Sequence, residues 1–137
     1  MVNETPFVLV VEDDELMQSV LEDALQDGGF ETAIVASGEE AVTLLKERVS
    51  AYKALVTDVN LRGRMNGWEV ARRARIMSAD FPIIYITGAA ADEWPSHGVP
   101  QSILLNKPFA PAQLLTAVSQ LLNMGMTTNT SALPTVP

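Results

Sequence analysis

Four apolar runs in this chain each lead to a polar side chain that could take part in metal or phosphoryl chemistry. The runs are residues 7–11, 54–57, 83–86 and 102–106, and the side chains that follow them are Glu12, Asp13, Asp58, Thr87 and Lys107. Such runs are typical of buried strands, and the carboxyl ends of parallel strands share one edge of a sheet. The sequence therefore predicts one site that contains carboxylates, a hydroxyl and an ammonium, which favours a hard metal cation together with a phosphoryl group.

The predicted metal ligands are Glu12, Asp13 and Asp58. Like charges packed together raise one another's pKa unless a cation intervenes. Ligands that are all oxygen favour Mg²⁺, or Mn²⁺ in its place. An acidic run after a strand can instead cap the following helix, and this role is assigned to Asp14.

Asp58 could be a nucleophile as well as a ligand, because a carboxylate can attack a phosphoryl centre and form an acyl phosphate. Mg²⁺ and the ammonium of Lys107 would offset the negative charge in that reaction. The structural alternative for Lys107 is an ion pair with an aspartate. Thr87 could donate its hydroxyl to a phosphoryl oxygen, and its alternative is a turn hydrogen bond. The expected proximity of Asp58 and Lys107 favours the phosphoryl role for Thr87.

Length and composition limit the classes of function. A chain of 137 residues with 47% apolar residues has the length of one globular domain. The absence of cysteine excludes disulfides, zinc–thiolate sites and cysteine nucleophiles. The net charge of −8 argues against direct binding to nucleic acid, which requires a basic face. No apolar run has the length of a membrane span and the N-terminus does not resemble a signal peptide, so we expect a cytoplasmic protein without membrane contact.

Strand-like and helix-like segments alternate along the chain, which predicts five βα units around a doubly wound parallel sheet in the order 2-1-3-4-5. The expected strands are residues 7–11, 32–35, 54–57, 82–86 and 102–105. The first helix, 15–27, is expected to bury Leu16 and Val20 on one stripe with Met17, Leu21, Ala24 and Leu25. We expect the domain to span residues 1–123 and residues 124–137 to form a flexible tail.

Two helices have clear start signals in the sequence, and a third segment contains residues that interrupt a helix. Ser37 and Asn66 each precede a glutamate by three residues, which is typical of a capping box. Prolines and a glycine within 88–100 predict a short or distorted fourth helix. His97 is expected to be an exposed loop residue, and Trp94 in the same segment is interpreted as a contact for a partner rather than a packed anchor.

Taken together, these motifs resemble the response-regulator receiver domain of two-component signalling over roughly residues 6–123. The resemblance rests on VVEDDE, the strand-ending Asp58, Asn66-Gly67, Thr87 and Lys107-Pro108-Phe109. It implies a flavodoxin-like (βα)5 sandwich. It also implies that Asp58 is the phosphoacceptor, that Thr87 and Lys107 bind phosphoryl oxygens, and that Lys107–Pro108 is a cis peptide. Mg²⁺ would be held by Asp13 and Asp58 directly, by Glu12 through water, and by the backbone carbonyl of Asn60.

Three departures from the family pattern bear on switching. Leu104 stands where the family usually has an aromatic residue, so coupling of Thr87 to an aromatic rotamer is not expected in its usual form. Gly88 follows the threonine in place of the common alanine. The loop from Asp58 to Gly67 is slightly longer than usual and lacks the common proline.

The resemblance also implies partners. The phosphoryl donor would be a phosphohistidine of a histidine kinase or a histidine phosphotransfer protein. A stand-alone receiver of this kind would act only on its own phosphorylation and dephosphorylation, and it would switch binding to a downstream protein that the sequence does not identify, with a homodimer as a further option. The alternatives are a Mg²⁺-dependent phosphohydrolase with an aspartyl nucleophile and an inactive receiver-like interaction module.

Overall fold

The computed structural model describes residues 7–130, and its centre is a five-stranded parallel sheet in the order β2-β1-β3-β4-β5. The strands are β1 (Phe7–Val11), β2 (Glu31–Val35), β3 (Ala54–Asp58), β4 (Ile83–Thr87) and β5 (Ile103–Asn106). The helices are α1 (Glu15–Asp27), α2 (Gly38–Arg48), α3 (Gly67–Met77), α4 (Trp94–His97) and α5 (Pro111–Thr130), with 3₁₀ turns at Val49–Ala51 and Ala91–Glu93. The predicted fold class and strand order are confirmed.

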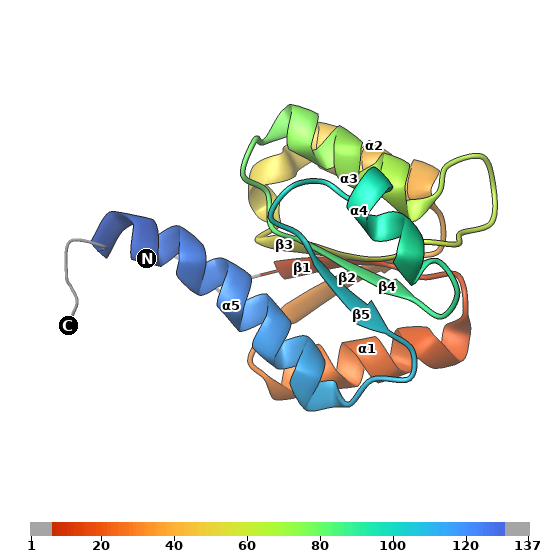
Figure 1. The fold of residues 1–137 in the computed structure, drawn as a ribbon, viewed down its shortest axis with the longest axis horizontal. Coiled ribbons are helices and arrows are strands. Elements are labelled where there is room, and N and C mark those ends of the chain that lie inside the picture. The colour runs from red at the N-terminus through yellow and green to blue at the C-terminus, as the bar shows by residue number, and fades with distance from the viewer. Residues whose placement is uncertain (1–6, 131–137) are drawn as a thin grey trace.

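The helices form a layer on each side of the sheet. Helices α1 and α5 lie on one face, and α2, α3 and α4 lie on the other (Figure 1). Alternation along β1 shows why both faces are apolar: Val8 and Val10 belong to the cluster with α1 and α5, whereas Leu9 and Val11 belong to the cluster with α2 and α3. The central strands are thus buried on both sides, which leaves their carboxyl ends as the place for polar groups.

Two of the three predicted helix caps are present. The Ser37 side chain accepts a hydrogen bond from Glu40 N at 3.2 Å, and the Asn66 side chain accepts one from Glu69 N at 3.0 Å. Asp14 occupies the position before α1, but its side chain makes no capping hydrogen bond. The capping role assigned to the Asp14 side chain was therefore wrong, and its backbone N–H instead donates to Glu12 Oε2 at 3.1 Å.

Helix α1 buries a narrower stripe than expected. Leu21, Ala24 and Leu25 are buried, but Leu16 and Val20 are 78% and 43% exposed. Successive residues in a helix are 100° apart, so the Leu16/Val20 pair lies one step around the axis from Leu21 and faces solvent. The expectation that these two residues join the core was wrong.

The last helix runs further than the sequence indicated. Helix α5 extends to Thr130, beyond the boundary expected at residue 123. No proline occurs between Pro111 and Pro134, so nothing in that stretch removes a backbone donor from the helix. Residues 131–137 of the expected tail lie outside the described residues, and the flexibility of the tail stays a prediction.

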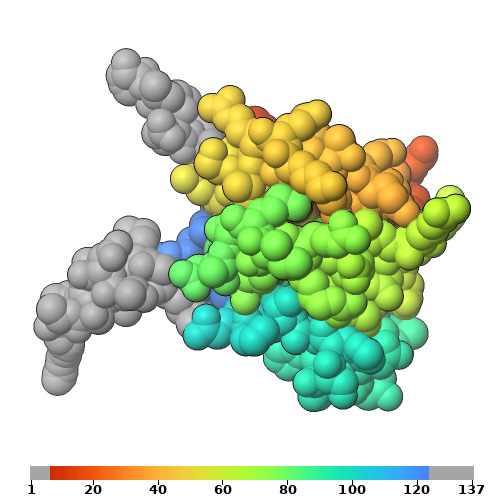
Figure 2. Space-filling model, turned by 90° about the horizontal axis from the view of Figure 1, so that it is seen from above, coloured from red at the N-terminus to blue at the C-terminus, as the bar shows by residue number. Residues whose placement is uncertain are grey.

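The connection between β4 and β5 has the reduced helix that the sequence predicted, since α4 has four residues. Trp94 is partly buried and its indole N–H donates to Ser102 Oγ at 2.9 Å, so it packs within this segment, contrary to the interpretation as a partner contact. His97 is exposed as expected, although it ends α4 instead of lying in a loop. Figure 2 shows the surface of this side of the molecule, with α2, α3 and the β4–β5 segment side by side.

Within the described residues, no helix combines the length and apolar character needed to cross a bilayer.

Candidate functional site

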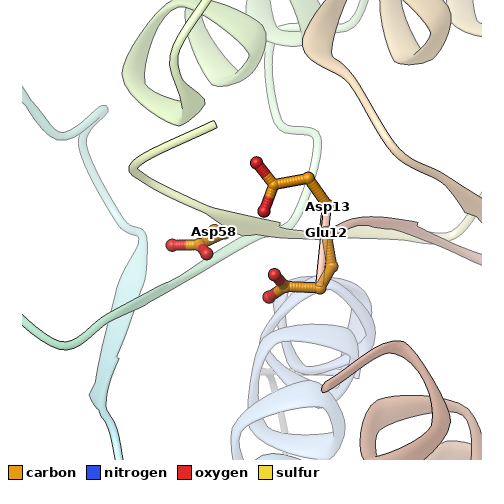
Figure 3. Close-up of side chains that lie close together, drawn as sticks. All are labelled: Glu12, Asp13 and Asp58. Atoms are coloured by element: carbon orange, nitrogen blue, oxygen red, sulfur yellow. The ribbon is translucent and has the colours of Figure 1, made fainter. Parts of the chain in front are cut away.

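The acidic side chains meet because β1 and β3 are neighbours. Val11 pairs with Thr57, so the residues that follow, Glu12 and Asp58, emerge side by side at the same edge of the sheet. One carboxylate oxygen each from Glu12, Asp13 and Asp58 lies within 4.8 Å of the other two. Figure 3 shows Glu12 and Asp13 leaving the end of β1 on opposite sides and both turning toward Asp58.

Lys107 brings an ammonium to this group from the edge strand. It follows β5, its backbone N–H donates to Thr87 O at 2.9 Å, and its side chain crosses the end of β4 to reach Asp58 at the end of β3. Its Nζ lies 3.0 Å from Asp58 Oδ2 and 3.7 Å from Glu12 Oε1. The Lys107–Pro108 peptide is cis, as the resemblance implied.

Glu12 is completely buried, and its two oxygens differ. Oε2 accepts the hydrogen bond from Asp14 N, whereas Oε1 has no hydrogen-bond partner within the described structure. Burial raises the pKa of Glu12 to about 7, and the negative charge of Asp58 adds to the rise. A carboxylate in this position gains from a nearby cation, since ionised groups away from water need a partner.

The pKa of Lys107 depends on two opposing effects. Burial lowers the pKa of Lys107, but the hydrogen bond to Asp58 and the negative charges of Asp58 and Glu12 outweigh it, so the net shift is upward. The ammonium is therefore held in its charged form at the site. That charge offsets part of the repulsion between the two carboxylates.

Thr87 is fully buried at the end of β4, next to β3 and β5. Its Oγ1 accepts hydrogen bonds from Ala89 N at 3.2 Å and Ala90 N at 2.9 Å. The turn hydrogen bond considered for this residue is thus present in the structure. A hydroxyl that accepts two bonds still has one proton to donate, so this turn does not exclude a bond from Thr87 to a ligand.

The loop between β3 and α3 contributes two further contacts. Asn60 N donates to Asp58 Oδ1 at 3.3 Å, so both oxygens of Asp58 have a donor nearby. Arg62 N donates to Asp13 Oδ2 at 2.9 Å, and Arg62 Nε lies 3.7 Å from the same oxygen. The sequence analysis did not identify Arg62, because Asp13 and Arg62 are 49 positions apart and neither strand order nor spacing predicts how a loop folds back.

The donor set fits a small divalent cation. All the charged ligands are carboxylate oxygens, which Mg²⁺ and Mn²⁺ prefer. Within the described structure Glu12 Oε1 is buried without a hydrogen bond, and its cationic neighbour Lys107 Nζ is 3.7 Å away, beyond hydrogen-bond distance, so this oxygen is open to a further positive partner. The structure thus brings together four of the predicted site side chains, namely Glu12, Asp13, Asp58 and Lys107, and their chemical roles stay predictions.

Comparison with known proteins decides the family. A family model described as the response regulator receiver domain matches residues 8–119. The chain belongs to this family. Receiver domains are modules of two-component signalling rather than conventional enzymes.

Several curated proteins resemble this chain. The response regulator receiver protein CpdR of Brucella abortus is 32% identical over 117 residues, which is 84% of this chain and 95% of that protein. The transcriptional regulatory protein AfsQ1 of Streptomyces coelicolor is 38% identical over 87 residues. PrrA of Mycobacterium tuberculosis is 31% identical over 134 residues. The alignments span 37% of AfsQ1 and 56% of PrrA, so those two proteins are considerably longer than this receiver domain.

Solved structures agree with the fold. A response regulator receiver protein from Sinorhizobium medicae is 46% identical, with a TM-score of 0.85 over 88% of this chain and 96% of that one. The receiver domain of the sensor histidine kinase PA1611 of Pseudomonas aeruginosa is 27% identical, with a TM-score of 0.76 over 87% of this chain and 98% of that one. That second structure has a magnesium ion coordinated in its active-site cleft.

Proposed function

We propose that this receiver accepts a phosphoryl group on Asp58 from a phosphohistidine of a histidine kinase or a histidine phosphotransfer protein. The observation that carries the proposal is the position of Asp58: its carboxylate lies next to two other carboxylates and 3.0 Å from the Lys107 ammonium. Membership of the receiver family supports this assignment. In the reaction, an oxygen of Asp58 forms a bond to phosphorus, the P–N bond of the donor breaks, and the imidazole nitrogen keeps the electron pair and takes up a proton.

Mg²⁺ would be held by Asp13 and Asp58, by Glu12 through water and by the backbone carbonyl of Asn60. When bound, the ion would supply positive charge that offsets the charge on the transferred group. The magnesium in the cleft of the PA1611 receiver supports this choice of cation. Lys107, already hydrogen-bonded to Asp58, would remain in reach of the phosphoryl oxygens and neutralise them.

Thr87 would connect phosphorylation to the surface. Its hydroxyl proton would be donated to a phosphoryl oxygen, and its Oγ1 already holds the backbone of Ala89 and Ala90. A shift of Thr87 toward Asp58 would therefore move the start of the β4–β5 connection, which includes α4. The outcome that we propose is altered binding of a downstream protein in the cytoplasm, without contact to nucleic acid or membrane, and with homodimerisation as one form that the altered binding could take.

Phosphoryl acceptance is tested by incubating the protein with Mg²⁺ and acetyl phosphate and measuring its intact mass. We expect the mass of one added phosphoryl group, which is absent after chelation of Mg²⁺ and absent in Asp58→Asn. Asp14→Asn is the matched control, since Asp14 is an exposed acid close to the site in sequence and should leave the product unchanged. Equal labelling of Asp58→Asn would contradict the assignment of Asp58.

Metal binding by Asp13 gives a second prediction. Asp13→Asn is expected to weaken Mg²⁺ binding by about tenfold or more, because it removes one charge and one strong oxygen ligand. Asp14→Asn is expected to bind Mg²⁺ as the unaltered protein does. Amide chemical shifts followed during a Mg²⁺ titration measure both affinities, and equal affinities for the two variants would rule out Asp13 as a ligand.

The two alternative functions make different predictions. A phosphohydrolase needs a further acid or base beside its nucleophile, and Asn60, whose backbone N–H donates to Asp58, cannot fill that role. Sustained turnover of small phosphate esters would favour the hydrolase over a receiver. Failure of millimolar Mg²⁺ to shift any amide resonance would favour an inactive interaction module.

A further inference from the structure

The loop between β3 and α3, residues 59–66, places a cation against the acidic site. This loop projects from the edge of the molecule, in yellow-green at the right of Figures 1 and 2. Arg62 N donates to Asp13 Oδ2 at 2.9 Å, and the guanidinium Nε lies 3.7 Å from the same oxygen. The Arg62 side chain is nevertheless 85% exposed. Its backbone is thus fixed at the site while its charged end can move.

A second anchor holds this loop in place. Arg64 N donates to Glu39 Oε2 at 3.0 Å, two residues after the contact to Asp13. Gly63 between them has a φ of 97°, which residues with a side chain rarely adopt. This conformation lets consecutive parts of the loop bind carboxylates on two different elements, Asp13 after β1 and Glu39 in α2. The position of Arg62 is therefore set by the fold of the loop.

The two cations of the site differ in exposure and in how closely they are paired. Lys107 is only 26% exposed and is paired with Asp58 and Glu12. Arg62 pairs with Asp13 across a longer distance and at the surface, where ion pairs contribute little and yield readily to competitors. A divalent ion that binds Asp13 would repel the guanidinium but could leave the hydrogen bond from Arg62 N intact. A retained bond of that kind would keep the ligand oriented.

We propose that Arg62 is a tethered cation that Mg²⁺ displaces from Asp13 and that then binds the oxygens of the incoming phosphoryl donor. This inference rests on the proposed function. Guanidinium groups match phosphate oxygens in a bidentate geometry. A chain with a net charge of −8 repels anionic donors, so an exposed cation at the rim of the site would raise the rate of their productive approach. In this role Arg62 binds the donor directly and competes with the metal for Asp13.

The first arm of the test is Mg²⁺ affinity, measured from amide shifts during titration. Arg62→Gln keeps the backbone hydrogen bond and removes the charge, so it is expected to bind Mg²⁺ about two- to fivefold more tightly. Arg62→Lys should stay close to the unaltered protein. Arg64→Gln is the matched control, because it removes an exposed arginine of the same loop whose backbone bonds Glu39 instead of the site. The gain in Arg62→Gln should shrink at high salt, which screens exposed charges.

The second arm is the rate of phosphorylation by acetyl phosphate at saturating Mg²⁺. Here Arg62→Gln is expected to be slower by about threefold or more, with Arg62→Lys largely restoring the rate and Arg64→Gln unaffected. Tighter Mg²⁺ binding together with slower phosphorylation in Arg62→Gln is the combination that the proposal predicts. Unchanged or weaker Mg²⁺ binding in Arg62→Gln, an unchanged rate, or equal effects in Arg64→Gln would each overturn it. If the unaltered protein binds no Mg²⁺ or is not labelled on Asp58, the proposed function itself has failed, and this result is distinct from the others.

Discussion

Gly67→Ala is expected to destabilise the domain by about 3 kcal/mol or more, near the upper end of the cost of overpacking. A methyl carbon at residue 67 would overlap the carbonyl oxygen of Asp58 and would lie 2.8 Å from the Cα of Val59. Both neighbours are backbone atoms, so no side chain can rotate away to make room. Gly67 N also donates to Val59 O at 2.8 Å, which ties the start of α3 to the end of β3. Urea denaturation followed by circular dichroism measures the loss.

Gly88→Ala is the matched control for this substitution. The nearest atom that a methyl carbon would meet there is Lys107 Cβ at 3.8 Å, which is an ordinary contact distance, and Gly88 is exposed. Its free energy of unfolding is expected to stay within about 0.5 kcal/mol of that of the unaltered protein. Equal stability of the two alanine variants would show that the backbone at β3 and α3 can separate without cost.

The second large effect is a fall in stability as pH rises when divalent ions are absent. The pKa of Glu12 is about 7 in the folded chain, against an ordinary value of 4.5. Between these two values the folded state binds more protons than the unfolded state, so the free energy of unfolding decreases with increasing pH. The shift corresponds to about 3 kcal/mol, present below pH 4.5 and lost by about pH 7.

Glu12→Gln isolates this contribution, because it keeps the shape and removes the charge. Its stability should be almost flat from pH 5 to pH 7, a window inside the two pKa values of Glu12. Mg²⁺ should stabilise the unaltered protein more as pH rises, since the ion binds ionised Glu12, and it should stabilise Glu12→Gln less. Denaturation midpoints measured with chelator and with Mg²⁺ provide the comparison. Parallel pH profiles for the two proteins would show that Glu12 does not carry the effect.

The sequence predicted which side chains come together because their relative positions follow from the order of the strands. Glu12, Asp58, Thr87 and Lys107 each end or directly follow an apolar strand, so strand order alone placed them at one edge. Arg62 was missed for the opposite reason. It lies in a loop whose course depends on hydrogen bonds to Asp13 and Glu39, and local residue types do not specify these distant partners.

Errors in the fold came from elements with weak local signals. Leu16 and Val20 are apolar and were therefore expected in the core. The sequence alone could not show that Met17, Leu21 and Leu25 of the same helix cover the sheet next to α5 without them. Helix α5 passed its expected end because a polar stretch without proline is compatible with either helix or coil. The side chain of Asp14 fits a helix cap by type, but it accepts no hydrogen bond from the first turn of α1.

The surroundings of Trp68 give this protein an internal spectroscopic sensor. Its indole is 3% exposed, packs edge-to-face on Tyr85 with ring centroids 4.6 Å apart, and donates to Glu93 Oε1 at 3.3 Å. His97 at the end of α4 stacks on the same ring, with centroids 6.1 Å apart. Fluorescence from Trp68, with Trp94 replaced by phenylalanine, can therefore follow movements of residues 91–97 in real time without any attached dye.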